Sequence, residues 1–285
     1  MSRYIIDRIS GRVVMLLGVA SFFVLVLITG FILRESLPAL QQLGIVRILF
    51  GTEWYPRYEE YGILTMVVGS TAVTLLALGL AVPLSLGTAV LLAEVAPPSA
   101  RRIVRPAIEL LVGIPSVVYG LVGLVVLAPG IARLAGLGSG SSVLAAGIVL
   151  AIMVLPTITS ISEDSIRALP RTLKEGSFAL GATHWQTIFH VLLPAAKRGI
   201  VASIMLGSGR AIGETMAMVM VIGNAPIFPG SLLDPARTLT GNIAVEIAYA
   251  TGLHQSTLFV TGLVLLVFVM IINSASLIAY RRGNR

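Results

Sequence analysis

The sequence predicts an all-α integral membrane protein with six transmembrane helices. Its composition gives the first two observations: 56% of the 285 residues are hydrophobic and only 12% are charged, whereas a soluble domain typically carries about 25% charged residues. The third observation is that the apolar residues gather into six runs, each close to the length needed to cross about 30 Å of hydrocarbon. These observations exclude a soluble globular protein.

The six apolar runs define the expected spans in chain order. They are residues 13–33, 63–93, 110–132, about 143–160, 199–223 and about 257–279, and only the fifth contains charged residues. The first run follows three arginines, as the apolar part of a signal peptide would, but it is too long and no small-residue cleavage site comes after it. We therefore expect it to be a retained first span.

Basic residues alternate between the connections of these runs. Fourteen of the 20 Lys and Arg residues lie at the two ends of the chain and in the second and fourth connections. By the positive-inside rule, both termini and the fourth connection are expected in the cytoplasm, with the chain in the cell (inner) membrane. Membrane topology therefore explains the net charge of +7 better than binding to a nucleic acid does. Membrane lipid is an expected partner.

Two segments are then expected on the outer side. The first precedes the second span and carries aromatic residues typical of an interfacial belt, namely Trp54, Tyr55, Tyr58 and Tyr61. The second, residues 224–256, places Leu239, Ile243 and Ile247 on one helical face. This periodicity predicts a short helix at the membrane interface.

The longest cytoplasmic connection, about residues 163–198, predicts a helix-turn-helix. Pro170 suits a first helical turn and Gly181 a C-terminal stop, and Thr183 and Gln186 have the spacing of a capping box. An apolar face follows at helical spacing and ends at Pro194; its members are Trp185, Ile188, Phe189 and Leu192. Periodicity alone leaves two interpretations open: the face lies against the bilayer or the bundle, or another protein covers it. Mixed charge and two membrane tethers argue against DNA binding.

The run from Glu175 to Pro194 resembles the EAA loop of ABC-importer permeases, which reads Glu-Ala-Ala, three residues, Gly, nine residues, Ile-x-Leu-Pro. Here it reads Glu-Gly-Ser, three residues, Gly181, nine residues, Val-Leu-Leu-Pro, so the full spacing is kept. The resemblance implies a cytoplasmic coupling helix that inserts into a cleft on a separate ATPase. It assigns Glu175, Gly176, Gly181 and Pro194 to that coupling.

Further stretches are similar to the permeases of the phosphate-specific transport system, particularly the C-type subunit (PstC type). They are residues 86–94, 108–120, 209–217 and 221–224. The resemblance implies an ABC-importer type I permease (MetI-like) bundle over residues 63–280, with an N-terminal helix and external segment over residues 1–62. It also implies three partners: a second permease (PstA type), an ATPase dimer (PstB type) that binds ATP and Mg²⁺, and an external phosphate-binding protein (PstS type).

Arg210 and Glu214 lie within the fifth apolar run, four residues apart, so a continuous helix would let them pair. Ionisable residues at mid-membrane normally face a bundle interior or a water-filled path. A mutual salt bridge that fixes helix orientation is the structural alternative. Because the two charges would cancel, we expect one chain to form only part of an anion site. The resemblance implies a heterodimer of permeases and associates both residues with translocation. A second cation from the partner permease would then resolve the cancellation of charge.

Small residues recur at intervals of four along the same run and predict close helix packing. They are Gly199, Ser203, Gly207, Ala211 and Thr215. No catalytic, metal or cofactor site is expected in this chain: it has no cysteine, its histidines lack metal-ligand spacing, and neither Lys174 nor Lys197 belongs to a nucleotide-binding loop. Two rivals to a phosphate permease stay open, namely a permease for molybdate or sulfate, and an ion-coupled secondary transporter with Glu214 as a proton relay.

Overall fold

The computed structural model describes residues 2–282, with side chains described for residues 10–272 and 274. Within this part of the chain, six helices are long and apolar enough to cross a membrane, as the hydropathy predicts. They are Ser10–Leu43, Leu64–Val95, Ser116–Ala135, Val143–Arg167, His184–Gly213 and Gly252–Ile272. The all-helical six-span prediction is therefore confirmed.

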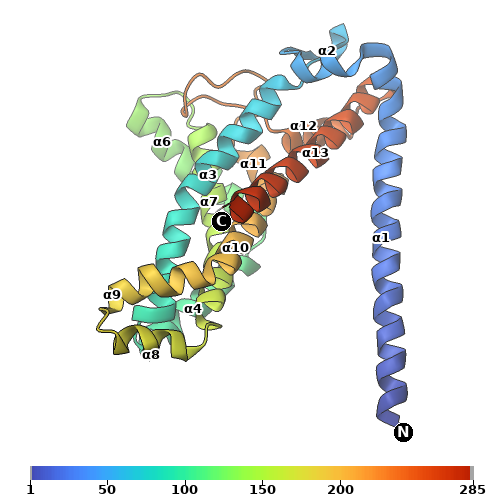
Figure 1. The fold of residues 1–285 in the computed structure, drawn as a ribbon. Coiled ribbons are helices and arrows are strands. Elements are labelled where there is room, and N and C mark those ends of the chain that lie inside the picture. Colours follow the sequence, from blue (N-terminus) through green and yellow to red (C-terminus); the bar gives the residue numbers. More distant parts are fainter. Residues whose placement is uncertain (1, 283–285) are drawn as a thin grey trace.

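Several of these spans combine more than one helical element (Figure 1). The α-helices are α1 (Ser2–Leu43), α2 (Ile45–Phe50), α3 (Leu64–Val90), α4 (Pro98–Gly113), α5 (Ser116–Val122), α6 (Ala128–Ala135), α7 (Val143–Arg167), α8 (Arg171–Ala179), α9 (His184–Thr187), α10 (Leu193–Gly213), α11 (Met216–Val221), α12 (Leu239–Glu246) and α13 (Gly252–Arg282). Three π-helical turns continue α3, α5 and α9, at Leu91–Val95, Gly123–Leu127 and Ile188–Leu192. Two short strands, β1 (Trp54–Tyr55) and β2 (Glu60–Tyr61), form an antiparallel pair.

The third span begins later than the apolar run predicts. Residues 110–113 are the last turn of α4, and the chain is extended at Ile114 and Pro115 before α5 starts. Proline disfavours the helical conformation of the residue before it, which explains the break. The apolar run thus joins the end of an amphipathic helix to the start of the span, and hydropathy alone cannot separate them.

Helix α7 is the centre of the bundle. Its buried residues pack with buried residues of α3, α10 and α11 in one apolar core. Close approach to α3 depends on Gly147, because a Cβ there would lie 2.5 Å from a methyl carbon of Leu76. The Ser85 hydroxyl also donates to the Leu155 carbonyl at 3.1 Å, tying α3 to α7 within the bundle.

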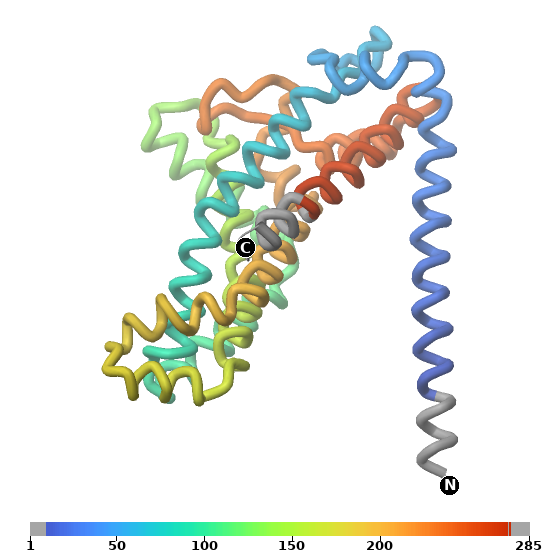
Figure 2. The backbone as a smooth tube through the Cα atoms, in the orientation of Figure 1, coloured from blue at the N-terminus to red at the C-terminus, as the bar shows by residue number. Residues whose placement is uncertain are grey.

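The bundle has two distinguishable ends. Helices α8 and α9 lie at one end, called here the α8 end, and α2 and α6 lie toward the other, the α2 end (Figure 1). The backbone trace shows α1 standing apart from the bundle over most of its length (Figure 2). Its contact with α13 includes an edge-to-face pair of Phe31 and Phe259, whose ring centroids are 5.7 Å apart.

The α2 end differs in two ways from the sequence prediction. Trp54 and Tyr61 are buried, whereas Tyr55 and Tyr58 are exposed, so only two of the four aromatic residues are available for an interfacial belt. Helix α12 forms as predicted, but it packs against α3, α11 and α13, which buries Leu239 and leaves Ile247 exposed, so the predicted apolar face is divided. Its buried polar residues, which require partners inside the fold, explain this position.

Candidate functional site

Arg210 lies near the end of α10 and is bound by a neutral side chain. Its Nη1 donates a hydrogen bond of 3.2 Å to Oγ1 of Thr157, which lies on α7 directly after Pro156. Both Arg210 and Thr157 are half-buried. Guanidinium has five N–H donors, so most of them stay available for another ligand.

Glu214 does not pair with Arg210, which corrects the sequence prediction. Helix α10 ends at Gly213, and Glu214 has an extended backbone with φ −69° and ψ 126°. Its Oε1 instead accepts the backbone N–H of Ala217 at 3.3 Å and so caps the first turn of α11. No ion pair within 4.0 Å joins the two side chains in the described residues. Arg210 lies within α10 and Glu214 lies after its end. The rule that residues i and i+4 share one face of a helix therefore does not apply to them.

A small cavity lies beside Glu214. Its volume is about 10 Å³, and Ser70, Thr74, Thr238 and Thr240 contribute polar groups to its lining. A space of this size holds about one water, so it cannot hold a tetrahedral oxyanion. Nearby residues Leu206, Gly213 and Met216 are exposed, which leaves this face of α10 and α11 uncovered by the chain's own helices.

The small-residue stripe of α10 packs against α7, as predicted. A Cβ on Gly199 would lie 1.9 Å from Oγ of Ser165, and one on Gly207 would lie 2.7 Å from Ile158. The hydroxyls of Ser162 and Ser203 share a hydrogen bond of 2.8 Å. Thr215 is the exception, because it lies beyond the end of α10.

The predicted helix-turn-helix is present at the α8 end. Helix α8 is followed by Gly181 with φ +82°, a left-handed conformation that favours glycine. The capping box of Thr183 and Gln186 is complete, with hydrogen bonds of 3.3 and 2.8 Å in the two directions. The hydroxyls of Ser177 and Thr187, 2.9 Å apart, join α8 to α9. Glu175 and Gly176 are exposed on α8.

The apolar face after the turn is divided, so the chain itself covers only part of it. Ile188 and Leu192 are buried, whereas Trp185 and Phe189 are each 57% exposed and stack with ring centroids 6.1 Å apart. The helix also does not end at Pro194 but continues into α10. The π turn ahead of Pro194, in which the Leu193 N–H bonds the Ile188 carbonyl, widens the backbone where the proline ring would otherwise clash.

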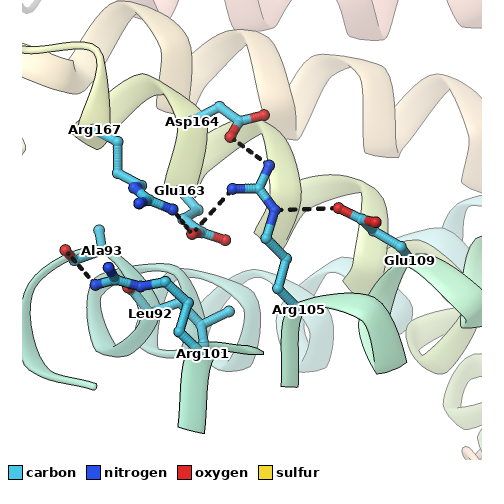
Figure 3. A network of polar contacts seen from close by, with 8 residues as sticks. All are labelled: Leu92, Ala93, Arg101, Arg105, Glu109, Glu163, Asp164 and Arg167. Carbon is cyan, nitrogen blue, oxygen red and sulfur yellow. Dashed lines mark hydrogen bonds and ion pairs between the residues drawn. The ribbon is translucent and has the colours of Figure 1, made fainter. Parts of the chain in front are cut away.

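An ion network joins α4 to the end of α7 near this loop (Figure 3). Arg105 contacts Glu109, Glu163 and Asp164 at 3.1, 3.5 and 3.0 Å, and Arg167 contacts Glu163 at 3.0 Å. The hydrogen bond to Glu109 is the main reason that the pKa of Arg105 is raised above its ordinary value. The i, i+4 pair of Arg105 and Glu109 is thus part of a larger network.

A second buried cluster, the Glu246 cluster, lies at the α2 end and was not predicted. The carboxylate of Glu246 accepts from Trp54 Nε1 at 2.9 and 3.0 Å and from Arg237 Nη1 at 2.6 Å, and it lies 2.8 Å from His254 Nε2. These residues connect the segment between α2 and α3 with α12, the residues just before it, and α13. Trp54 and Glu246 are 192 residues apart, so no local spacing could reveal their contact.

Thr157 was also missed, because a threonine in an apolar span is ordinary until its partner is known. The only sequence signal is its position after Pro156, where the helix loses one backbone donor. The structure brings Thr157 to Arg210 from 53 residues away. It does not bring Glu175 or Gly181 near Arg210, since these lie at the α8 end.

The sequence resembles known membrane transport proteins over most of its length. The family model described as "Binding-protein-dependent transport system inner membrane component" matches residues 81–283. A Bacillus subtilis protein named "Probable ABC transporter permease protein YqgH" is 43% identical over 285 residues, covering 95% of this chain and 91% of the relative. The Pasteurella multocida "Phosphate transport system permease protein PstC" is 39% identical over 247 residues, covering 80% of this chain and 77% of the relative.

The fold also resembles a solved structure. An inward-facing MetNI methionine ABC transporter chain superposes with a TM-score of 0.63 at 23% identity, covering 82% of this chain and all of that chain. Similarity at this level of identity supports the fold alone.

Proposed function

The chain belongs to the family of binding-protein-dependent transport system inner membrane components, and from this premise we propose that it is the phosphate-conducting permease subunit of an ATP-driven importer. The chain is therefore a membrane-spanning transport subunit, and ATP hydrolysis belongs to a separate subunit. The identity with relatives named as phosphate permeases supports phosphate as the substrate.

The proposed anion path is based on the positive charge of Arg210, which has no carboxylate partner among the described residues. A guanidinium within a spanning helix is costly unless it meets a compensating group. Its hydrogen-bond partner among the described residues is the neutral Thr157, and no carboxylate lies within ion-pair distance. An uncompensated cation of this kind suits a transported anion.

Glu214 contributes to the same path in a different way. Its carboxylate caps α11, and its backbone carbonyl accepts the Thr240 hydroxyl of α12 at 3.2 Å. Because the adjoining cavity is too small for an oxyanion and the neighbouring face is uncovered, we infer that a second permease of PstA type completes the anion site.

The α8 end is proposed as the coupling surface. Trp185 and Phe189 present an apolar pair to solvent, which suits contact with a PstB-type ATPase dimer that carries ATP and Mg²⁺. Glu175 and Gly176 contribute the exposed side of α8, Gly181 permits the turn, and Pro194 marks the entry to α10.

The proposed topology follows from the distribution of basic residues. Both termini and the α8 end would face the cytoplasm of an inner membrane, and the α2 end would receive a PstS-type phosphate-binding protein. Residues 1–62 would form an N-terminal helix and external segment, and residues 63–280 the permease domain, with a coupling loop at about 163–198.

Uptake of radiolabelled phosphate by proteoliposomes tests this function. The vesicles contain the chain, its second permease, the ATPase and the binding protein, with ATP trapped on the ATPase side. We expect uptake that requires ATP and binding protein and that survives a proton ionophore. Uptake driven by an ion gradient without ATP would instead establish a secondary transporter. Uptake of molybdate or sulfate in place of phosphate would overturn the substrate assignment.

A further inference from the structure

A cavity of about 470 Å³, lined by charged and apolar residues, opens at the α8 end, separate from the small cavity beside Glu214. It lies between the π turn after α3, the start of α4, the end of α7 and α8. Its charged lining residues are Glu94, Arg101, Arg167, Arg171, Lys174 and Glu175. The cavity thus carries four cationic side chains and two carboxylates, and we call it the Arg171 cavity.

Two of the guanidinium groups are held in place by the surrounding helices. Arg101 donates through Nε to the Leu92 carbonyl at 2.7 Å and through Nη2 to the Ala93 carbonyl at 3.1 Å. Arg167 donates to Glu163 at 3.0 Å, and Figure 3 shows both side chains in these contacts. Each guanidinium keeps further N–H donors, because it has five.

The other two cations come from α8 and differ in their pairing. Lys174 forms an ion pair with Glu94, which uses one of the two carboxylates. Arg171 is exposed and makes no hydrogen bond or ion pair with the residues whose side chains are described. The arrangement therefore leaves a surplus of positive charge, with Arg171 as the cation that has no partner.

We propose that the Arg171 cavity binds a phosphate group, either inorganic phosphate or the headgroup of an anionic phospholipid. Guanidinium forks match phosphate oxygens in paired hydrogen bonds, and basic pockets at the cytoplasmic ends of spanning helices suit lipid headgroups. Helix α8 begins at Arg171 without a side-chain cap, so its N-terminal dipole adds to the attraction.

Occupancy would have a structural effect. The cations come from α4, α7 and α8, so one bound phosphate group would cross-link the coupling-loop helix to two helices of the bundle. The site does not depend on which anion crosses the membrane, because none of its residues belongs to the Arg210 region.

The test measures binding to the full-length chain in nanodiscs, without ATP or transport. In discs of phosphatidylcholine, equilibrium dialysis measures the affinity for radiolabelled inorganic phosphate. In discs that contain phosphatidylglycerol, native mass spectrometry counts the phospholipids retained. Four chains are compared: wild type, Arg171→Ala, Arg171→Lys, and Arg102→Ala as the matched control. Arg102 is the exposed neighbour of Arg101 on α4, lies outside the cavity lining and likewise has no described partner.

In Arg171→Ala we expect either an affinity for inorganic phosphate about tenfold below that of wild type, or the loss of a retained phospholipid, with wild-type binding in Arg102→Ala. Loss in the phosphate arm identifies free phosphate as the ligand, and loss in the phospholipid arm identifies a headgroup. Arg171→Lys should recover part of the binding. Equal binding by Arg171→Ala and Arg102→Ala in both arms, or no binding by wild type in either, would overturn the proposal. This binding result does not depend on whether the reconstituted importer transports phosphate.

Discussion

The Nη1 atom of Arg210 lies 3.2 Å from the hydroxyl oxygen of Thr157, on the neighbouring helix of the bundle. The contact orients one edge of the guanidinium toward α7 and leaves the group's formal charge unpaired. The threonine hydroxyl thus fixes the position of the positive charge without neutralising it. A carboxylate at the same position would neutralise it.

Thr157→Val is expected to weaken phosphate uptake by about tenfold, because a hydrogen bond to a charged group is lost. The effect should fall mainly on the KM for binding-protein-delivered phosphate, and Thr157→Ser should restore most of it. Thr88→Val is the control, since that hydroxyl bonds only the Leu84 carbonyl of its own helix. Equal kinetics for Thr157→Val and Thr88→Val would contradict a positioning role.

Arg210→Met and Glu214→Leu are expected to act independently on stability, because the two side chains form no ion pair. Their effects on the free energy of unfolding should add within about 0.5 kcal/mol in the double variant. Chemical unfolding in detergent micelles measures this cycle. A double variant more stable than the sum would reveal a pairing that the structure does not contain. Arg210→Met alone should assemble with its partners and abolish uptake.

Gly181→Val should reduce binding of the ATPase. The backbone φ of +82° is strained for a β-branched residue, so the turn between α8 and α9 would shift the pair formed by Trp185 and Phe189. Pull-down of the ATPase with the membrane chain measures recovery. Gly87→Ala serves as the control because that glycine is helical and has open space around its Cβ position. Undiminished recovery and transport in Gly181→Val would remove the coupling assignment.

Glu246→Gln is expected to destabilise the α2 end. The substitution leaves Arg237 in a buried site without its carboxylate, and breaking a buried pair costs about 3–5 kcal/mol. The melting temperature in detergent should fall, whereas Glu53→Gln, at an exposed position with no described side-chain partner, should leave it unchanged. Matching melting temperatures for the two variants would show that the Glu246 cluster adds little stability.

Single-cysteine labelling should separate the two ends of the molecule, and the absence of native cysteine makes it clean. Leu180 is 90% exposed at the α8 end and Tyr58 is 79% exposed at the α2 end. In intact cells, a membrane-impermeant maleimide should label Tyr58→Cys and leave Leu180→Cys unmodified until the cells are opened. The reverse pattern would invert the proposed topology.

Local patterns in the sequence were sufficient to predict the features that depend on residues close together in the chain. Hydropathy predicts the six spans, and the capping box of Thr183 and Gln186 forms as its spacing indicates. The helix breaks were harder to predict. The sign of the break at Pro115 is the effect of the proline on the backbone of Ile114, which hydropathy does not register.

The candidate site was predicted only in part. The sequence identified Arg210 and Glu214 as the unusual charges, but the salt bridge left open as an alternative is absent from the described residues, because α10 ends at Gly213 and Glu214 instead accepts the Ala217 N–H. The partners that orient the charges, such as Thr157 for Arg210 and Trp54 for Glu246, come from distant parts of the chain. Side-chain periodicity records which face of a helix is apolar and carries no information about which residue will lie opposite.

The π turn before Pro194 has a mechanical consequence. Because the helix is not interrupted there, the segment from His184 to Gly213 is a continuous helical path of 30 residues, about 45 Å along the backbone axis at the rise of an α-helix. Trp185 stands near one tip and Arg210 near the other. We therefore expect a displacement of Trp185 to reach Arg210 along a continuous helical backbone, because no loop lies between the two residues. This continuity ends just beyond Arg210, where Glu214 has an extended backbone between α10 and α11.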